Sequence, residues 1–326
     1  MKSLLVFLIL SVTTLLGTCG QQGHPSAGSL LKASEAHQSK LPSSLQSKSC
    51  AGHHSREYVD RIPKVYTSTD SLCVVGLLCE ASQLKKKPAN WMLYFGRKFI
   101  GKPYVGGTLD QTRNETLVVN TRQLDCTTLV ELVLALSITA SHGETAFSCF
   151  LAHLLDVRYV AGRMAYTSRQ HYFTVWIEDN VREGLVNDIQ SPVPPFSAVQ
   201  TVNVNYMSTH ISAYRMLAAH PEWLPGIRAM EKGVSGKRFR YIPKRDINES
   251  ALMRRTIHDG DIIVIITSRR GLDTSHIGIA AWHDDGLHML NASSIHHRVV
   301  EEPMLLRDYM RRHLSQLGIR IVRPTL

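Results

Sequence analysis

The stretch Leu124-Asp125-Cys126-Thr127-Thr128-Leu129-Val130-Glu131 places an Asp-Cys pair at the start of an apolar run that continues to about Ala140. The spacing of its apolar residues predicts a helix whose first turn carries Cys126. The N-terminal end of a helix holds roughly +0.5 elementary charge, which favours a thiolate over a thiol. We therefore expect Cys126 to be nucleophilic near neutral pH. A buried core cysteine is the alternative that this stretch alone leaves open.

A candidate base for this thiol lies in the C-terminal third of the chain. The run Ser275-His276-Ile277-Gly278-Ile279 predicts a strand with His276 at its head, and Asp285-Gly286 predicts a hairpin turn before Leu290-Asn291-Ala292-Ser293. This hairpin would place Asn291 opposite His276 or one diagonal step away. An imidazole can accept a proton and return it near neutral pH, and an asparagine oxygen can fix its tautomer. The pattern indicates a Cys126, His276 and Asn291 site, although most of the sixteen histidines should be structural.

The rest of the pattern favours an α+β fold. Helices are predicted near residues 90–100 and 144–155 and around 208–219, and residues 171–177 have the composition of a strand. Four further strands are predicted in the last third, at residues 261–267, 275–282, 288–292 and 318–322. A helix that carries the nucleophile, followed by a mostly antiparallel sheet, is an α+β arrangement.

The N-terminus has the features of an export signal. Met1-Lys2-Ser3 precedes an apolar run from Leu4 to Leu16 that is too short to span a bilayer. We interpret residues 1–19 as a signal peptide, residues 20–57 as a flexible serine-rich tether and residues 58–326 as the folded domain. Membrane attachment through a lipidated Cys19 is an alternative to simple cleavage, although Thr18 suits lipidation poorly. The protein is expected to be exported, either periplasmic or a membrane-anchored lipoprotein.

The 326-residue chain has a net charge of +10 and a pI near 9.4, which implies affinity for polyanions. The export signal argues against nucleic acid as a partner. Basic residues at 232–245 alternate with Phe239 and Tyr241 as in some RNA-binding strips, but we interpret them as a solvated loop and strand.

Four cysteines remain once Cys126 and Cys19 are set aside: Cys50, Cys73, Cys79 and Cys149. A disulfide among them is allowed but not demanded by the spacing. No pair has the Cys-x-x-Cys spacing of a zinc or redox site, and Cys73 and Cys79 lie in an apolar stretch that suits core residues.

Several motifs together carry a resemblance to a known family. Gly101-Lys102-Pro103-Tyr104-Val105-Gly106-Gly107, Asp125-Cys126, Gly260-Asp261-Ile262-Ile263, Ser275-His276-Ile277-Gly278-Ile279 and Asn291-Ala292-Ser293 occur in the order found in the NlpC/P60 cell-wall hydrolases. Further matches such as Arg169-x-His171-Tyr172-Phe173, Trp176 and Gly271-Leu272-Asp273 make residues 100–326 similar to the N-acetylmuramoyl-L-alanine amidase-like branch, domain of unknown function 1460. The resemblance implies a papain-like fold.

The resemblance also implies roles for individual residues. Cys126 takes the nucleophile position and His276 that of the base. The third, polar position falls on Asn291, where many relatives have histidine. Tyr104 and Asp125 would line the substrate site, with Tyr104 also stabilising the oxyanion beside the Cys126 backbone N–H. A helix-capping role for Asp125 stays open.

The implied reaction is hydrolysis of the amide between the muramic acid lactyl group and L-Ala, with the 1,6-anhydro sugar as one substrate form. The wider family usually cuts after γ-D-Glu instead. Arg169, His171, Trp176 and Ser275 are branch-like residues that would contact substrate, or alternatively lie in a strand surface. The expected partners are peptidoglycan fragments, with no nucleic acid, protein partner or cofactor.

Two readings from other classes are weaker. A zinc amidase would need metal ligands, and the only histidine groups that stand out are His53-His54 in the tether and the adjacent pair His296-His297, whose chelation geometry is poor. A non-catalytic wall-binding module would suit the basic surface, but it leaves Cys126, His276 and Asn291 without a purpose.

Overall fold

The computed structural model describes residue 50 and residues 56–326. The expected signal peptide, Cys19 and most of the expected tether lie outside these residues. The helices are α1 (Arg56–Arg61), α2 (Ser68–Ser82), α3 (Trp91–Arg97), α4 (Cys126–Ser141), α5 (Phe147–Arg158), α6 (Phe173–Arg182), α7 (Tyr206–Thr209), α8 (Arg215–Ala219), α9 (Leu224–Val234), α10 (Ala251–Thr256) and α11 (Leu306–Arg311). The strands are β1 (Lys64–Val65), β2 (Leu117–Val118), β3 (Val186–Ile189), β4 (Ala198–Thr201), β5 (Arg238–Pro243), β6 (Ile262–Thr267), β7 (Thr274–Trp282), β8 (Leu287–Ser293), β9 (Arg298–Glu301) and β10 (Gln316–Pro324).

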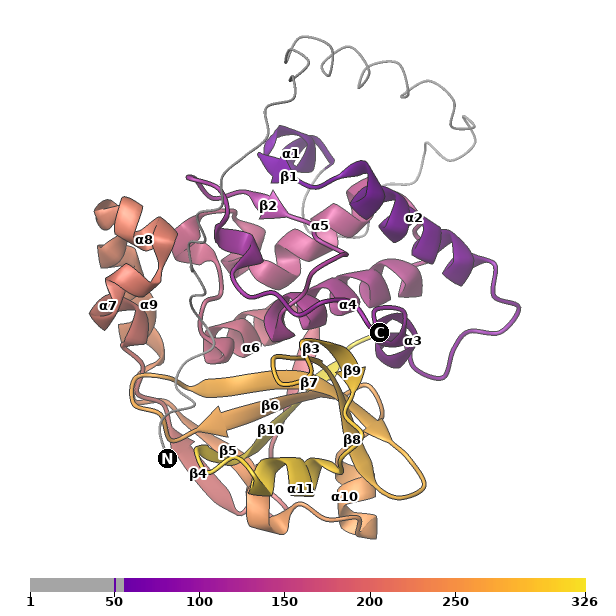
Figure 1. Ribbon diagram of the computed structural model, residues 1–326, viewed down its shortest axis with the longest axis vertical. Helices are drawn as coiled ribbons and strands as arrows, with labels where there is room; N and C mark the ends of the chain where they lie inside the picture. The colour runs from indigo at the N-terminus through magenta and orange to yellow at the C-terminus, as the bar shows by residue number, and fades with distance from the viewer. Residues whose placement is uncertain (1–49, 51–55) are drawn as a thin grey trace, which may run out of the picture. The chain divides into compact units, whose positions relative to one another are not determined.

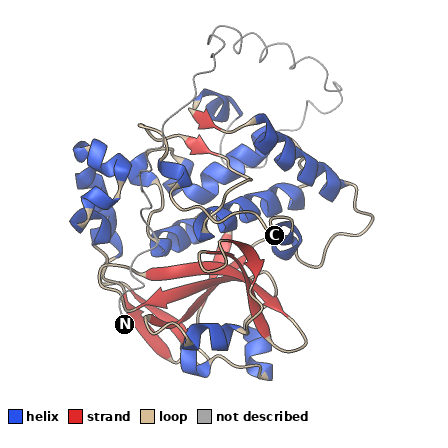
Figure 2. Ribbon diagram, in the orientation of Figure 1, coloured by secondary structure: helices blue, strands red, loops and turns tan. Residues whose placement is uncertain are grey.

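An eight-stranded antiparallel sheet forms the centre of the fold (Figures 1 and 2). Its strand order is β4-β5-β10-β6-β7-β8-β9, and β3 also pairs with β10. The central strand β6 reads Ile-Ile-Val-Ile-Ile-Thr, and each of these residues is buried. A strand that is apolar on both sides fits a sheet whose two faces are both covered.

One face of the sheet is covered by a layer of helices that includes α4. Every residue of α4 from Thr128 to Thr139 is buried, so this mostly apolar helix is covered on all sides. It packs between α2, α3 and α5 on one side and strands β7 and β8 on the other. This position holds the first turn of α4, and with it Cys126, against the sheet.

The opposite face of the sheet is covered by α10 and α11, which lie below it in Figure 1. A second apolar cluster fills this space, with Met253 of α10 and Leu306 of α11 packed against Ile265 and Met289 of the strands. A third cluster gathers the apolar side chains of α7, α8 and α9. The mixed helix and sheet architecture with an antiparallel sheet agrees with the sequence-based prediction.

The predicted strands of the last third are confirmed, and most helix predictions need only small shifts at their ends. The helix predicted at residues 90–100 is α3, with Asn90 as its N-cap. The helix predicted at residues 144–155 is α5, which begins at Phe147 because residues 142–144 complete the end of α4. The helix predicted at 208–219 is broken, since Thr209 Oγ1 donates to the Asn205 carbonyl and a 3-10 turn precedes α8.

The strand predicted at residues 171–177 is wrong, because this segment opens α6. Phe173, Trp176 and Ile177 lie on one buried helix face at the spacing i, i+3, i+4. The Asp273 carboxylate accepts a hydrogen bond from the Thr174 backbone N–H at 2.7 Å, which satisfies the start of the helix from 99 residues away. The sequence next to Thr174 therefore does not indicate this capping of the helix.

The structure describes only residue 50 and residues 56–57 of the expected tether. Cys50 forms a disulfide with Cys149 of α5, and α1 begins at Arg56. Cys73 and Cys79 are free and half-buried on α2 instead of lying in the core. Among the helices of the described part, none combines the length and apolar character that crossing a membrane requires.

Candidate active site

Cys126 is the first residue of α4, as the sequence predicts, and a capping box fixes the helix start. The Asp125 side chain accepts a hydrogen bond from the Thr128 backbone N–H at 2.8 Å. In return, the Asp125 backbone N–H donates to Thr128 Oγ1 at 2.9 Å. Asp125 is therefore a helix cap, which is the second of the two roles that the sequence leaves open for it.

Cys126 is a free, half-buried cysteine. Burial raises the pKa of Cys126 to about 12, and the Asp125 carboxylate adds to the rise. The backbone N–H groups of Ile277 and Thr127 lower the pKa of Cys126, but by less. A helix end supplies typically about 0.3–1 kcal/mol, which is less than one pKa unit. Desolvation thus opposes the helix dipole at Cys126, and the expected thiolate stays a prediction.

His276 and Asn291 lie on neighbouring strands and are joined by a hydrogen bond. The distance from His276 Nε2 to Asn291 Oδ1 is 3.0 Å. Ile279 of β7 is paired with Leu290 of β8, and continuing this register puts Asn291 one diagonal step from His276, as the hairpin prediction allows. Burial lowers the pKa of His276, and the bond to Asn291 partly opposes this effect. The resting imidazole is therefore neutral near pH 7.

The orientation of Asn291 is itself fixed. Its side chain is 1% exposed, and its Nδ2 group donates to the Met289 carbonyl at 3.2 Å. The Oδ1 atom is thus directed at His276, where it accepts the Nε2 proton of the neutral ring. This arrangement leaves Nδ1 of His276 as the atom that can accept a proton.

The thiol of Cys126 contacts the sheet at the backbone of Ile277. Ile277, whose backbone N–H acts on the thiol, directly follows His276 and packs its side chain toward α4. Side chains alternate along a strand, so His276 points to the other face of the sheet, which α11 covers. The charge of a Cys126 thiolate contributes to raising the pKa of both Tyr104 and Tyr309, although burial is the larger cause for each. The sulfur therefore lies within electrostatic reach of groups from both sides of the sheet.

Tyr309 and His313 belong to this neighbourhood and were not found by sequence reasoning. Tyr309 is 7% exposed on α11, and His313 Nδ1 donates to its carbonyl at 2.7 Å. A positive charge on His313 lowers the pKa of His276. The only sequence signal is the i, i+4 spacing of two aromatic rings, one on α11 and one just after it, which is too common to indicate a site.

Tyr104 reaches the site through a main-chain contact. Its backbone forms a parallel bridge with Leu124, two residues before Cys126, and its N–H donates to the His297 carbonyl at 2.9 Å. The half-buried ring packs against the apolar cluster that surrounds α4. Ser275 is half-buried as well, and its hydroxyl lies 3.5 Å from the Ile265 carbonyl at a bulge in the β6–β7 pair.

Arg169 and Trp176, for which the sequence leaves both substrate binding and a structural role open, have structural partners. The Arg169 guanidinium is bound to Asp110 at 2.5 Å and to Glu115 at 3.7 Å. Trp176 has no exposed surface and stacks on Phe173 at 4.6 Å between ring centroids. A fully buried ring cannot present a face to a sugar, so the predicted role of Trp176 is not supported. His171 is half-buried and donates from Nε2 to the Tyr166 carbonyl at 2.8 Å.

A polar hollow of about 320 Å³ opens where β6 leads into β7. Its lining includes Thr267, Arg269 and Arg270, which precede His276 in the chain. Both arginines are exposed. The hollow can accept an acidic group at the end of the sheet that carries His276.

The metal ligands suggested by the sequence do not form a cluster in the described residues. His296 Nε2 lies 3.1 Å from Glu302, and His53 and His54 are outside the described residues. A different group, His142, Glu144 and His153, lies at the C-terminal end of α4 and brings three potential ligand atoms together. Its residues are separated by spacings that match no common metal motif.

Comparison with known proteins places this geometry among amidases. Residues 94–318 match the family described as N-acetylmuramoyl-L-alanine amidase-like. A crystal structure of a N-acetylmuramoyl-L-alanine amidase from Bacteroides uniformis is 35% identical, with a TM-score of 0.68, and the match covers 76% of this chain and 100% of that one. No curated protein sequence matches the chain.

Two other solved structures are similar. A Bacteroides fragilis protein described as a candidate xylanase is 36% identical over 71% of this chain and 99% of its own, with a TM-score of 0.66. A Legionella pneumophila protein of domain of unknown function 1460 is 22% identical, with a TM-score of 0.60 over 79% of this chain and 95% of its own. The last likeness concerns the fold alone.

Proposed function

Because the chain belongs to the N-acetylmuramoyl-L-alanine amidase-like family, we propose that it is a cysteine-dependent peptidoglycan amidase of the NlpC/P60 type with a papain-like catalytic arrangement. The bond that it hydrolyses joins the lactyl group of N-acetylmuramic acid to L-Ala. The observation that carries the proposal is the position of Cys126 at the start of α4, where its thiol lies against the backbone N–H of Ile277, the residue after His276, while His276 is hydrogen-bonded to Asn291.

Acylation starts from a neutral thiol, so the sulfur attacks the carbonyl carbon in the same step in which the thiol proton is transferred. The Cys126 sulfur bonds to the lactyl carbonyl carbon while His276 Nδ1 takes the thiol proton. The oxyanion that forms is stabilised by the Cys126 backbone N–H and the Tyr104 hydroxyl. When the intermediate collapses, the C–N bond breaks and His276 gives its proton to the L-Ala nitrogen. The free stem peptide leaves, and the lactyl group remains as a thioester on Cys126.

Deacylation repeats the same proton transfers with water. His276, neutral again, takes a proton from a water molecule that attacks the thioester carbonyl. The second tetrahedral intermediate releases the sulfur, which regains its proton from His276, and the muramic acid lactyl carboxylate departs. Asn291 holds the imidazole in one tautomer through both halves of the reaction.

The hollow between β6 and β7 offers a basic surface for substrate, although Cys126 and His276 are not among its lining residues. A stem peptide carries several carboxylates, and the exposed guanidinium groups of Arg269 and Arg270 line the hollow before β7. We place the acidic stem peptide against this hollow and the sugar on the side of Tyr104. Muropeptides with either normal or 1,6-anhydro muramic acid are the substrates, and the enzyme acts in the periplasm, after export through residues 1–19, either cleaved or anchored through Cys19.

The experiment that tests the proposal is mass spectrometry of products from defined muropeptides in both sugar forms. The wild-type chain should release a stem peptide that begins with L-Ala, and Cys126→Ala should release none. Cys73→Ala is the matched control, because it removes a free, half-buried thiol on α2. Release of L-Ala-D-Glu or of a sugar-linked dipeptide would instead establish a γ-D-glutamyl endopeptidase. If no product depends on Cys126, the result would favour a non-catalytic wall-binding module.

A further inference from the structure

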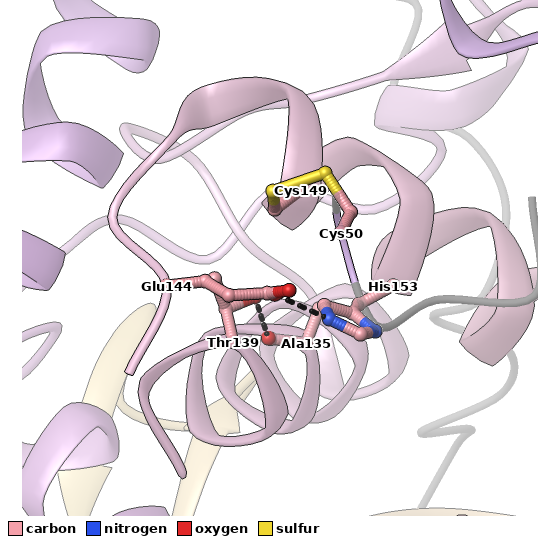
Figure 3. Close-up of a disulfide and its surroundings, with 6 residues drawn as sticks. All are labelled: Cys50, Ala135, Thr139, Glu144, Cys149 and His153. Atoms are coloured by element: carbon pink, nitrogen blue, oxygen red, sulfur yellow. Dashed lines mark hydrogen bonds and ion pairs between the residues drawn. A yellow bond between two sulfur atoms is a disulfide. The ribbon is translucent and has the colours of Figure 1, made fainter. Parts of the chain in front are cut away.

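Three side chains with metal-binding atoms converge at the end of α4 that lies opposite Cys126. They are His142, Glu144 and His153, and one ligand atom from each lies within 4.8 Å of the other two. Figure 3 shows Glu144 and His153 facing one another next to the disulfide between Cys50 and Cys149. With a rise of 1.5 Å per residue, the 16 residues of α4 separate this group from Cys126 by about 24 Å.

The turn after α4 positions two of these side chains. The Glu144 backbone N–H donates to the Thr139 carbonyl at 3.0 Å, and the Gly143 N–H donates to the Ala140 carbonyl at 2.9 Å. These two bonds form a Schellman motif, with Gly143 in the left-handed conformation at φ 71°. The motif fixes His142 as the C-cap of the helix and Glu144 two residues beyond it.

The third side chain comes from α5 and is held rigidly. His153 is 2% exposed, and its Nε2 atom lies 2.9 Å from Glu144 Oε2. Cys149 lies one helical turn earlier on α5, so the disulfide to Cys50 anchors the same helix face. The His142 ring is exposed, with its centroid 5.5 Å from that of His153.

The local charge favours a cation. The C-terminal end of a helix carries roughly −0.5 elementary charge, and Glu144 contributes a carboxylate.

We propose that His142, Glu144 and His153 form a site for a divalent transition-metal ion, with Zn²⁺ as the best match. Two imidazoles and one carboxylate are ligands that zinc binds tetrahedrally at about 2.0–2.2 Å, with water in the fourth position. Such ligand atoms lie roughly 3.4 Å apart in a tetrahedron. Glu144 and His153 are already in contact, and rotation of the exposed His142 ring toward them brings its ring nitrogen to the same distance. The ion would join the end of α4 to α5 and has no part in the reaction at Cys126.

A Zn²⁺ titration by calorimetry tests this site. The full chain is used with Cys126→Ala, because a free active-site thiol also binds zinc, and without reductant, so that the disulfide stays intact. One ion per chain is expected. His142→Ala and Glu144→Gln should each weaken binding by at least 10- to 100-fold, because losing a direct ligand costs no less than losing a hydrogen-bonding partner of a ligand. His210→Ala is the matched control, because His210 is also exposed and follows a helix, and it should bind as tightly as the parent.

Two further measurements separate this site from other histidines and from the proposed amidase. Co²⁺ bound in place of Zn²⁺ should give the visible absorption of a four-coordinate ion, and His142→Ala should abolish it. In the chain with Cys126 intact, a chelator should leave muropeptide hydrolysis unchanged but lower the melting temperature. Zinc affinity that is the same in His142→Ala and Glu144→Gln as in the parent would overturn the proposal, whatever the outcome of the activity assay.

Discussion

The Nε2 atom of His276 lies 3.0 Å from the Oδ1 atom of Asn291, across the β7–β8 pair. Because Asn291 is buried and its Nδ2 group is bonded to Met289, it acts as a fixed acceptor for one ring nitrogen. The other ring nitrogen is then the one that exchanges protons during the proposed reaction. An asparagine cannot titrate, so this orientation persists over the whole pH range in which the protein is folded.

Asn291→Ala should lower kcat/KM for muropeptides by roughly 10- to 150-fold. This range corresponds to the about 1.5–3 kcal/mol of a hydrogen bond to a charged group, because the imidazolium forms only during the reaction. Asn291→His should recover much of the activity, since an imidazole can also accept the bond. Unchanged kcat/KM in Asn291→Ala, with an unchanged circular dichroism spectrum, would show that Asn291 does not orient the base.

The pH dependence of the reaction should have a single acid limb, below the ordinary His pKa of 6.5. Burial lowers the pKa of His276, so the ring loses its proton, and becomes a base, at lower pH than a free imidazole. Because the pKa of Cys126 is raised to about 12, no second limb from the thiol is expected near neutrality. The profile of kcat/KM from pH 4 to pH 9 measures this behaviour.

The same shift sets the sign of the pH effect on stability. The folded-state pKa of His276 lies below its unfolded value, so the unfolded chain binds more protons between the two. The stability that neutral His276 contributes is present above pH 6.5 and is lost as the pH falls through this window.

Alkylation of Cys126 by iodoacetamide gives an independent check on the protonation state of the thiol. Fast alkylation at pH 5–6 that His276→Ala abolishes would indicate a thiolate and imidazolium pair instead of a neutral thiol.

The sequence predicts those features of the site that depend on neighbouring residues. The start of α4 follows from Asp125, Cys126 and the apolar period after them, and the capping box is formed within four residues. The hairpin that joins His276 to Asn291 follows from alternating apolar residues and one Asp-Gly turn. Each of these signals is complete within about twenty residues of the chain.

The features that could not be predicted depend on contacts between distant segments. Residues 171–177 have β-branched and aromatic side chains, yet Asp273 caps them as a helix. The pKa of Cys126 depends on how deeply the helix start is buried, which its sequence does not state. Tyr309 reaches the site only because α11 folds under the sheet. The pairing of Cys50 with Cys149 likewise depends on how α5 is placed.

Arg169→Ala should destabilise the fold and should not act mainly on substrate binding. Arg169 is 6% exposed and bound to Asp110 and Glu115, so its loss removes the ion pair from Asp110 and leaves Glu115 with its hydrogen bond from Tyr159. Breaking a buried ion pair in this way costs about 3–5 kcal/mol. Urea unfolding should show this loss, whereas the control Arg163→Ala, an exposed residue of the same segment, should not. A raised KM with unchanged unfolding would support the substrate-binding role suggested by the sequence.

Cys149→Ser should lower the free energy of unfolding by about 2–5 kcal/mol, because the disulfide to Cys50 closes a long loop. The two cysteines are 99 residues apart, and cross-linking them restricts the unfolded chain far more than the folded one. Urea unfolding of the variant, and of the wild type with and without reductant, measures the contribution of the disulfide to the free energy of unfolding. Chelator in all samples keeps a metal at His153 from adding to the difference.

Cys73→Ser is the control for that measurement, since Cys73 is free on α2 and its substitution removes no cross-link. Hydrolysis of muropeptides by Cys149→Ser well below its melting temperature should match the wild type, because Cys149 lies on α5 and contributes nothing to the proposed chemistry at Cys126. Equal unfolding midpoints for Cys149→Ser and the non-reduced wild type would mean that Cys50 and Cys149 do not remain paired in solution.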